Sequence, residues 1–379
     1  MKSLLPTNID YFDYNATHPP LRSIIEKAYS DYIAEFYNPS GATRFSLKNQ
    51  GYIENARKYF AALTKSPEKN IVFSSTGTEA NYLLIRALRA RLPEETKVIV
   101  SPFEHSSMYS ALRDHHFEMI VLSTDRTGIV NLEHLESLLE SEPHPIVCLH
   151  TGNETGVIQP TLAIKRLADL FQVDFLSDLM QAFGKVELDF EHFSGFTFSS
   201  HKIGGGMGAA ITGFNFDLEK YAMFGGGNQE NGHRAGTENL PAILSFQMAS
   251  EFQKDHLIEK NQKLNLFRTT IESELENLGC KIIAKDSPRV MNTSFVLLPI
   301  EEIDFFLLGM EEKGIMISTG SSCKSRAREA SASLLAMGYS KEESLRCIRI
   351  STGFLTTNEE VNRLIKNIKE LLATFGNLD

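Results

Sequence analysis

A lysine at the end of a short β-like segment could form a covalent bond with an aldehyde. Lys202 follows residues 196–200, a run of Phe, Thr and Ser, and precedes the glycines at 204–206. A lysine amine forms a Schiff base with a carbonyl group most readily when its neighbours lower its pKa. By itself, this pattern is more typical of an ordinary lysine between a strand and a glycine turn.

An upstream aspartate favours the covalent interpretation. Asp178 follows the apolar segment 173–176, so it also stands at the end of a predicted strand. An aspartate and a lysine in these places would hold the pyridinium nitrogen and the aldehyde carbon of pyridoxal 5′-phosphate (PLP). The pyridinium N–H is a suitable partner for a carboxylate whose burial is otherwise costly, and Gln181 could bind the hydroxyl group of the same ring. The sequence therefore predicts a PLP site.

Three segments could bind the phosphate group of that cofactor. Gly77 and Thr78 open a predicted helix, where backbone N–H groups form an anion site, although Ser or Thr before a helix is usually only an N-cap. Ser199 and His201 stand next to Lys202 and could bind the same group. The glycine-rich segment 225–239 could be a lid, a linker or an anion-binding turn contributed across a dimer interface.

Three further side chains could contact the ring or the substrate. His105 follows another predicted strand and could lie flat on a cofactor ring, although a single histidine in such a place is more often structural or exposed. Asn153 could bind the ring hydroxyl and a substrate carboxylate, or it could simply satisfy a turn. Arg349 alternates with apolar residues in a predicted strand, where it could clamp a carboxylate or form a structural ion pair.

One cysteine has surroundings that favour reactivity. Cys323 lies among Gly and Ser residues and is followed by basic residues, which favour a thiolate on a loop that is free to move. Cys148 lies in an apolar segment and is expected in the core, and Cys280 and Cys347 have no comparable surroundings. The wide spacing of these cysteines suggests neither a zinc site nor a disulfide framework.

Short apolar strands that alternate with helices must position these residues. The pattern predicts strands at 71–74, 98–100, 119–122, 146–149 and 173–176, and helices that include 21–36, 52–63 and 78–91. Such an alternation is typical of an α/β fold with a mostly parallel sheet, whose ligands bind at the carboxyl ends of the strands. An amphipathic helix over 240–278 then leads into a smaller α+β region. We expect a large domain (residues 15–245) and a small α+β domain (1–14 and 246–379) that carries Cys323.

Composition restricts the classes of function. The 379 residues are 42% hydrophobic and 23% charged, as in ordinary globular proteins. The net charge of −10 argues against nonspecific nucleic-acid binding, which needs a basic surface. No apolar segment approaches the roughly 20 residues of a membrane span, and no signal-peptide core follows Met1. We therefore expect a cytoplasmic protein with reduced thiols, without a direct nucleic-acid or membrane partner.

Taken in order, these motifs resemble those of the cysteine desulfurases, the NifS-like branch of the class V aminotransferase superfamily (fold-type I PLP enzymes). The resembling segments span nearly the whole chain: 12–17 (FDYNAT), 77–81 (GTEAN), 104–105 (EH), 153–154 (NE), 178–185 (DLMQAFGK), 200–202 (SHK), 234–239 (RAGTEN), 320–323 (GSSC) and 348–351 (IRIS). The resemblance implies a PLP-binding domain with a seven-stranded, mostly parallel sheet, and a homodimer.

The resemblance also implies a role for each candidate residue. At the ring, Lys202 would form the Schiff base, Asp178 would pair with the pyridine nitrogen, Gln181 would bind the ring oxygen, and His105 would stack on the ring and transfer protons. The phosphate would be bound by Gly77, Thr78, Ser199 and His201, with Thr237 of the partner subunit. Asn153 would contact the cofactor and, with Arg349, the substrate carboxylate, and Cys323 would accept sulfur.

Three departures from the family pattern concern loops. Gly206 and Met207 stand where the family commonly has Pro-Lys, and residues 38–43 (NPSGAT) lack the histidine of an early family motif. The residues after Cys323 are more basic than is usual for the family. These departures concern the choice of sulfur acceptor and the behaviour of the loop, since none removes a core catalytic group.

The activity implied by the resemblance is conversion of L-cysteine to L-alanine, with a persulfide formed on Cys323. The sulfur would pass to a protein acceptor such as an iron–sulfur scaffold, or into thio-cofactor or tRNA biosynthesis. A selenocysteine lyase or another class V aminotransferase or lyase is the alternative, although an aminotransferase has no use for a cysteine such as Cys323. A non-enzymatic protein with this fold is a third interpretation, against which Asp178, Lys202 and Arg349 together argue.

Overall fold

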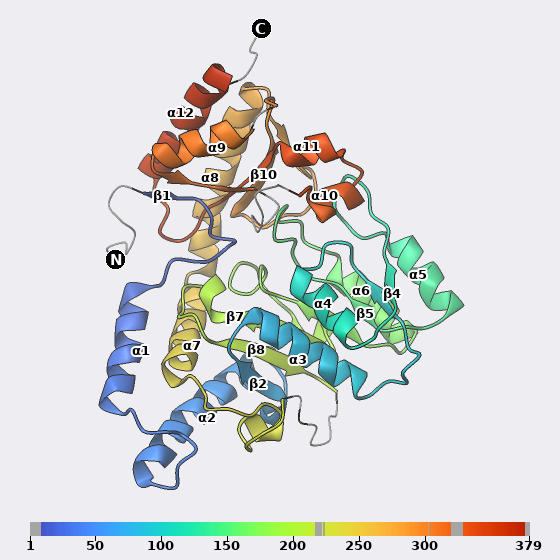
Figure 1. The fold of residues 1–379 in the computed structure, drawn as a ribbon, viewed down its shortest axis with the longest axis vertical. Coiled ribbons are helices and arrows are strands. Elements are labelled where there is room, and N and C mark those ends of the chain that lie inside the picture. The colour runs from blue at the N-terminus through green and yellow to red at the C-terminus, as the bar shows by residue number, and fades with distance from the viewer. Residues whose placement is uncertain (1–8, 217–221, 223, 302, 320–328, 376–379) are drawn as a thin grey trace.

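The computed structural model describes residues 9–216, 222, 224–301, 303–319 and 329–375 (Figure 1). Within these ranges the elements form two groups. A seven-stranded sheet and its helices lie in the lower part of Figure 1, and a four-stranded antiparallel sheet with its helices lies in the upper part. Cys323 lies outside the described residues.

The seven-stranded sheet is mostly parallel and has the order β2-β8-β7-β6-β5-β3-β4. Only β8 (Ala210–Phe214) runs antiparallel to its neighbours among these described strands. The other strands are β2 (Ile71–Ser74), β3 (Val98–Val100), β4 (Met119–Val121), β5 (Ile146–Val147), β6 (Phe175–Asp178) and β7 (Gly195–Ser199). The predicted α/β fold with a seven-stranded sheet is therefore confirmed.

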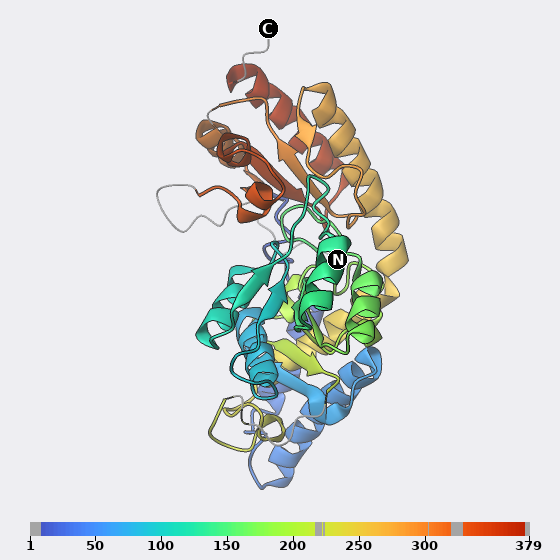
Figure 2. The ribbon, with the colours of Figure 1, turned by 90° about the vertical axis from the view of Figure 1, so that its right-hand side faces the viewer.

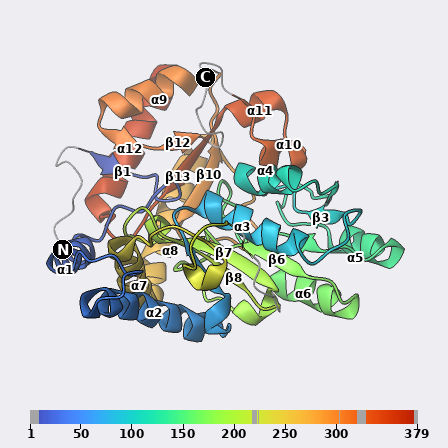
Figure 3. The same ribbon diagram turned by 60° about the horizontal axis from the view of Figure 1, so that its bottom comes forward.

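Helices cover both faces of this sheet. Successive strand residues point to opposite sides, and apolar side chains occur on both sides. Ile71 and Phe73 of β2 belong to one apolar core, whereas Val72 between them belongs to another. Figure 3 shows α3 and α4 on one side of the sheet and α2 and α7 on the other. The helices around the sheet are α1 (Arg22–Ala34), α2 (Arg44–Thr64), α3 (Gly77–Arg89), α4 (Ser106–Asp114), α5 (Leu132–Ser141), α6 (Thr161–Leu170) and α7 (Leu240–Asp255).

The four-stranded sheet has the order β12-β13-β10-β9 and its own apolar core. Its elements are α8 (Leu257–Asn277), β9 (Lys281–Ile282), β10 (Thr293–Leu297), α9 (Ile303–Glu312), β12 (Ser318–Thr319), α10 (Ala332–Ala336), α11 (Lys341–Leu345), β13 (Cys347–Ser351) and α12 (Asn358–Phe375). The N-terminal strand β1 (Asp10–Tyr11) pairs in parallel with β11 (Ile315–Met316), so residues far apart in the sequence meet here. The bounds of the two expected domains stay a prediction.

The single helix predicted over 240–278 is wrong. α7 ends at Asp255 and α8 begins at Leu257, because His256 has non-helical backbone angles (φ −107°, ψ 7°) and its ring stacks on Phe252 at 4.2 Å between centroids. Figure 2 shows α8 extending from the lower group of elements to the upper one. No glycine or proline marks this break in the sequence. The helix predicted over 52–63 begins earlier, at Arg44, where Thr43 caps it.

Candidate active site

A cavity of about 400 Å³ opens at the carboxyl ends of the parallel strands, where such sheets bind ligands. Its volume suits a small-molecule ligand. Most of the predicted site residues line it: Gly77, Thr78, His105, Asn153, Asp178, Gln181, His201, Lys202 and Arg349. Residues that stand up to 272 positions apart in the sequence, from Gly77 to Arg349, therefore meet around one cavity.

Lys202 follows β7 in a short 3₁₀ turn and its amine faces this cavity. Nζ donates to the backbone oxygens of Asn15 (2.7 Å) and Ala16 (2.8 Å). Burial lowers the pKa of Lys202 to about 8; the charge of Arg349 also lowers it, whereas Asp178 and Asp13 act in the opposite direction. A larger fraction of the Lys202 amine is therefore in the neutral, nucleophilic form at pH 7 than in an ordinary lysine.

Asp178 ends β6 and is 6% exposed. Its Oδ2 accepts a hydrogen bond from Asn81 Nδ2 (3.0 Å) and its Oδ1 accepts one from the backbone N–H of Met180 (2.8 Å). Asn81 is oriented in turn by Thr197, whose hydroxyl donates to Asn81 Oδ1 (2.6 Å). These neutral donors fix the carboxylate but leave its negative charge available to a cationic ligand.

The start of α3 borders the same cavity. Thr76 caps this helix by accepting the backbone N–H of Glu79 (3.1 Å), so the N–H groups of the first turn are oriented outward beside Gly77 and Thr78. A Cβ atom at Gly77 would lie 2.6 Å from Met180 Cε, so a larger residue there would displace the end of the Met180 side chain. This helix start can bind an anion such as a phosphate.

The other predicted phosphate ligands divide into two groups. His201 lines the cavity; its Nδ1 contacts Thr17 Oγ1 (3.1 Å), and burial and the neighbouring Lys202 lower its pKa to about 4, so the ring is neutral at pH 7. Ser199 is buried with its hydroxyl 3.4 Å from the Ala209 carbonyl oxygen, and Thr237 is exposed. Within the described chain, neither Ser199 nor Thr237 lines this cavity.

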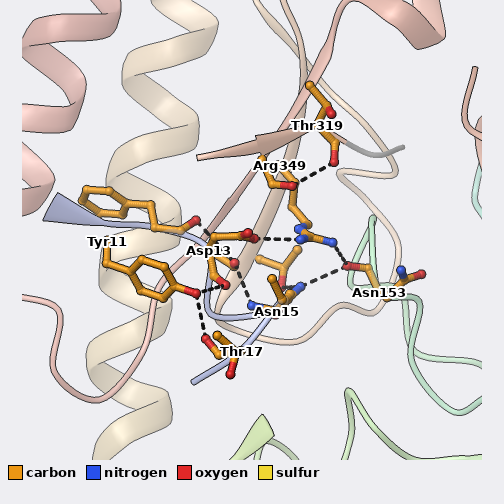
Figure 4. Close-up of polar contacts among 12 residues, drawn as sticks. Tyr11, Asp13, Asn15, Thr17, Asn153, Thr319 and Arg349 are labelled. Carbon is orange, nitrogen blue, oxygen red and sulfur yellow. Dashed lines mark hydrogen bonds and ion pairs between the residues drawn. The ribbon is translucent and has the colours of Figure 1, made fainter. Parts of the chain in front are cut away.

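Arg349 reaches the cavity from β13 of the other sheet (Figure 4). Its Nη2 donates to Asp13 Oδ1 (2.7 Å) and its Nη1 donates to the backbone oxygen of Asn153 (2.9 Å). Its Nε is buried and has no hydrogen-bond partner among the described residues. Arg349 thus forms the ion pair of the structural interpretation and also lines the cavity, so the carboxylate clamp stays a prediction.

His105 is the N-cap of α4 as well as a cavity residue. Its Nδ1 accepts the backbone N–H of Ser107 (3.2 Å), so the neutral ring carries its proton on Nε2. The preceding residue, Glu104, is buried, and burial followed by the charge of Asp178 raises its pKa to about 8. An acid that stays protonated at pH 7 adds no second negative charge beside Asp178.

Sequence reasoning missed several residues that hold the site together. Asn15 accepts Lys202 and Gln181 at its backbone oxygen, and its Nδ2 donates to the Asn153 backbone oxygen (3.2 Å), as Figure 4 shows. Asp13 is the counter-ion of Arg349. Their only signal was membership of the FDYNAT segment, because the partners are more than 130 residues away.

The chain is similar to known proteins over nearly its whole length. The family model for aminotransferase class-V matches residues 10–364. The chain belongs to the aminotransferase class-V family. A putative cysteine desulfurase IscS 1 of Bacillus subtilis is 28% identical to this class-V chain, covering 96% of it and 98% of the relative. Cysteine desulfurase 2 of Trichormus variabilis is 30% identical, covering 95% of this chain and 92% of the relative.

Solved structures resemble this class-V chain over nearly its whole length. A NifS-like protein from Rickettsia africae has a TM-score of 0.87 at 29% identity, covering 96% of this chain and 99% of that one. A structure of SspA in complex with cysteine has a TM-score of 0.78 at 27% identity, covering 91% and 99%. Among the described residues, no helix has the length and apolarity needed to span a membrane.

Members of the class-V family depend on PLP, and the residues of the cavity fit this cofactor. The Asp178 carboxylate complements a pyridinium N–H, the Lys202 amine complements an aldehyde, and the start of α3 complements a phosphate. Arg349, which lines the cavity, carries a guanidinium that complements a substrate carboxylate. The cavity therefore offers a chemically suitable group for each end of PLP and for an amino acid beside it.

Proposed function

We propose that this protein is a PLP-dependent cysteine desulfurase, which converts L-cysteine to L-alanine and transfers the sulfur to Cys323. The observation that carries the proposal is the meeting of Lys202, Asp178 and Arg349 at one cavity, in a chain whose relatives are named cysteine desulfurases. When bound, PLP supplies a ring that stabilises negative charge at the substrate α-carbon.

Different residues of the chain would bind different parts of this cofactor. Lys202 would bind the aldehyde carbon, Asp178 the ring nitrogen, Gln181 the ring oxygen, and His105 the face of the ring. The start of α3 at Gly77 and Thr78 would bind the phosphate with Ser199, His201 and, from a partner subunit, Thr237.

The same residues explain how a cysteine substrate would be oriented. Arg349, with Asn153 beside it, binds the substrate carboxylate and directs the α-carbon toward Lys202 Nζ. Because burial lowers the pKa of Lys202 to about 8, its amine can accept the α-proton and return it. His105 carries a proton at Nε2 that can be donated nearby.

The sulfur acceptor would be Cys323. Its thiolate attacks the substrate sulfur, an S–S bond forms, and the C–S bond of the substrate breaks. The products are L-alanine and a persulfide, and the balance requires no external oxidant. In the sequence Cys323 follows Thr319 by four residues, and Thr319 lines the cavity.

The nucleophile assignment is tested with purified protein and L-cysteine. Cys323→Ser should retain the visible absorbance of the bound cofactor but release no sulfide, whereas Cys280→Ser, which replaces a buried cysteine, should behave as the parent. Mass spectrometry of the parent should find one added sulfur atom on the peptide that contains Cys323. Undiminished sulfide release from Cys323→Ser would refute the assignment.

Further parts of the proposal concern partners. A cytoplasmic homodimer that delivers sulfur to a protein acceptor, such as an iron–sulfur scaffold, is the assembly that we propose. Apolar side chains exposed between the end of α1 and the start of α2, including Ile33 (71%), Phe36 (66%) and Leu47 (57%), support a subunit interface. Light scattering measures the mass in solution, and a monomer at micromolar concentration would contradict the dimer.

A further inference from the structure

A second lysine, half-buried, lies next to the proposed cofactor site. Lys185 Nζ donates to Asn15 Oδ1 (2.7 Å) and to Gln181 Oε1 (2.5 Å). Both of these acceptors are neutral amide oxygens. Burial lowers the pKa of Lys185 well below its usual value, and the charges of Lys202, Arg349 and Lys260 lower it further. An amine in such a cationic region is costly to keep out of water unless hydrogen bonds satisfy it.

The contacts of Lys185 decide which way the Gln181 carboxamide faces. A carboxamide has a donor end and an acceptor end, and an ammonium group can only donate. Because Oε1 of Gln181 faces Lys185, Nε2 faces the other way, where it donates one N–H to the Asn15 backbone oxygen (2.9 Å). The second N–H of Nε2 remains, on a residue that lines the cavity.

This orientation does not depend on the charge of Lys185. A neutral amine still carries two N–H bonds, enough for Asn15 Oδ1 and Gln181 Oε1. The Asn15 side chain is fixed at the same time, because its Oδ1 also accepts Asn292 Nδ2 (3.0 Å) and its Nδ2 donates to Thr293 Oγ1 (2.9 Å). Lys185 therefore stands in a hydrogen-bond network with one favourable arrangement.

We propose that Lys185 is a positioning residue that holds the Gln181 carboxamide with its N–H toward the cavity, so that the oxygen on the PLP ring meets a donor. The proposal rests on the proposed function, since it requires PLP in this cavity. Without Lys185, only the contact of Nε2 with the Asn15 backbone oxygen would hold this orientation, and a rotated carboxamide would present an oxygen to the ring oxygen, where two acceptors repel each other.

Lys260 provides a matched control. It is buried, its burial lowers its pKa to about 8, and it lines a neighbouring hollow together with Lys185 and Lys202. Its Nζ donates instead to the Gly184 backbone oxygen and to Gln253 Oε1. Lys260→Met thus removes a comparable buried amine while leaving the Lys185–Gln181 contact in place.

The experiment is a pH titration of the visible absorbance of the purified, cofactor-loaded protein. A donor facing the ring oxygen favours its anionic form, so losing this donor raises the pH midpoint of the absorbance change. Lys185→Met should raise the midpoint by about 0.5 to 1 pH unit, the size expected for one hydrogen bond. Lys260→Met should raise it less, and Gln181→Met should raise it about as much as Lys185→Met.

A double variant separates positioning from a general effect of charge. If Lys185 acts through Gln181, Lys185→Met adds no further shift in the Gln181→Met background. Additive shifts, or equal shifts from Lys185→Met and Lys260→Met, would overturn the proposal. If Lys185→Met does not fold, Lys185→Gln applies the same test, because its amide can either donate to or accept from Gln181 and should give a smaller shift in the same direction. A parent protein without any visible absorbance after incubation with PLP would instead contradict the proposed function.

Discussion

Two buried arginines, one in each group of elements, look alike until their nitrogens are compared. Arg57 on α2 uses all of them: Nη1 donates to Ile71 O and Glu230 Oε2 (2.6 Å each), Nη2 to Glu230 Oε1 (3.0 Å) and Nε to Glu54 Oε2 (3.1 Å). Arg349 pairs with Asp13, but its Nε has no partner among the described residues. Arg57 is therefore saturated, whereas Arg349 keeps a free donor.

The difference indicates the role of each arginine better than burial does. The side chains are 2% and 7% exposed, so burial does not separate them. A saturated guanidinium stabilises the fold, because removing it leaves Glu230 buried and unpaired. An unpaired Nε alone does not mark a ligand site, since the ion-paired Arg289 also has one; Arg349 differs because it lines the cavity, where a ligand could contact its guanidinium.

Arg57→Met should give the largest effect of any change that tests this comparison. Loss of the buried partner of Glu230 should lower the free energy of unfolding by about 3–5 kcal/mol, which urea denaturation followed by circular dichroism measures. Glu54→Gln removes only the partly exposed partner (41%) and should change stability by less than about 1 kcal/mol. If Arg57→Met were as stable as the parent, the hydrogen bonds of the Arg57 guanidinium would not stabilise the fold.

Arg349→Met should impair substrate binding more than it destabilises the fold. The lost carboxylate contact should raise the KM for L-cysteine about 100-fold, while the variant keeps the visible absorbance of the cofactor. Steady-state kinetics of alanine formation measures the change. An unaltered KM would assign Arg349 to the structural class of Arg57.

Asp13→Asn should sharpen the comparison with a smaller change of opposite sign. The amide oxygen can still accept from Arg349 Nη2, but the negative charge that partly neutralises this arginine is gone. The KM for L-cysteine should fall about 2- to 5-fold, as expected for a partly exposed ion pair. A rise in KM would mean that Asp13 acts mainly by orienting Arg349.

The smallest predicted effect concerns pH. Arg349 lowers the pKa of Lys202 and Asp13 raises it, around a value of about 8. Cofactor-free protein should therefore capture PLP faster as the pH rises through about 8, where Lys202 becomes neutral. The midpoint of this rate profile should move up in Arg349→Met and down in Asp13→Asn, as stopped-flow absorbance would measure. Shifts in the same direction for both variants would contradict this electrostatic account.

Sequence reasoning predicted the parts of the molecule that depend on local pattern. The apolar segments around residues 71–74 and 98–100 are strands as predicted, and the polar residues that follow the strands line one cavity. Asp178 and Lys202 were identifiable because Asp178 ends a strand and Lys202 follows the end of another within three residues. The break at His256 was not, since the apolar pattern continues through it and only packing against Phe252 marks it.

Contacts over long sequence distances could not be predicted in the same way. Glu230 is 173 residues from Arg57, and Asp13 is 336 residues from Arg349. No periodicity connects such residues, because the tertiary fold alone brings them together. In the sequence, Lys185 was only the last residue of a motif, and the structure shows that it contacts Gln181, four residues earlier, together with Asn15.

The placement of Asn15 also determines when the site can be completed during synthesis. Its amide contacts Thr293, 278 residues later, and its backbone N–H contacts Ser351 Oγ, 336 residues later. A ribosome adds roughly 5–20 residues per second, so the earliest part of this chain waits tens of seconds for its partners. Until then the Asn15 backbone oxygen, which accepts a hydrogen bond from Lys202, has no fixed position. PLP can therefore bind only after translation is nearly finished.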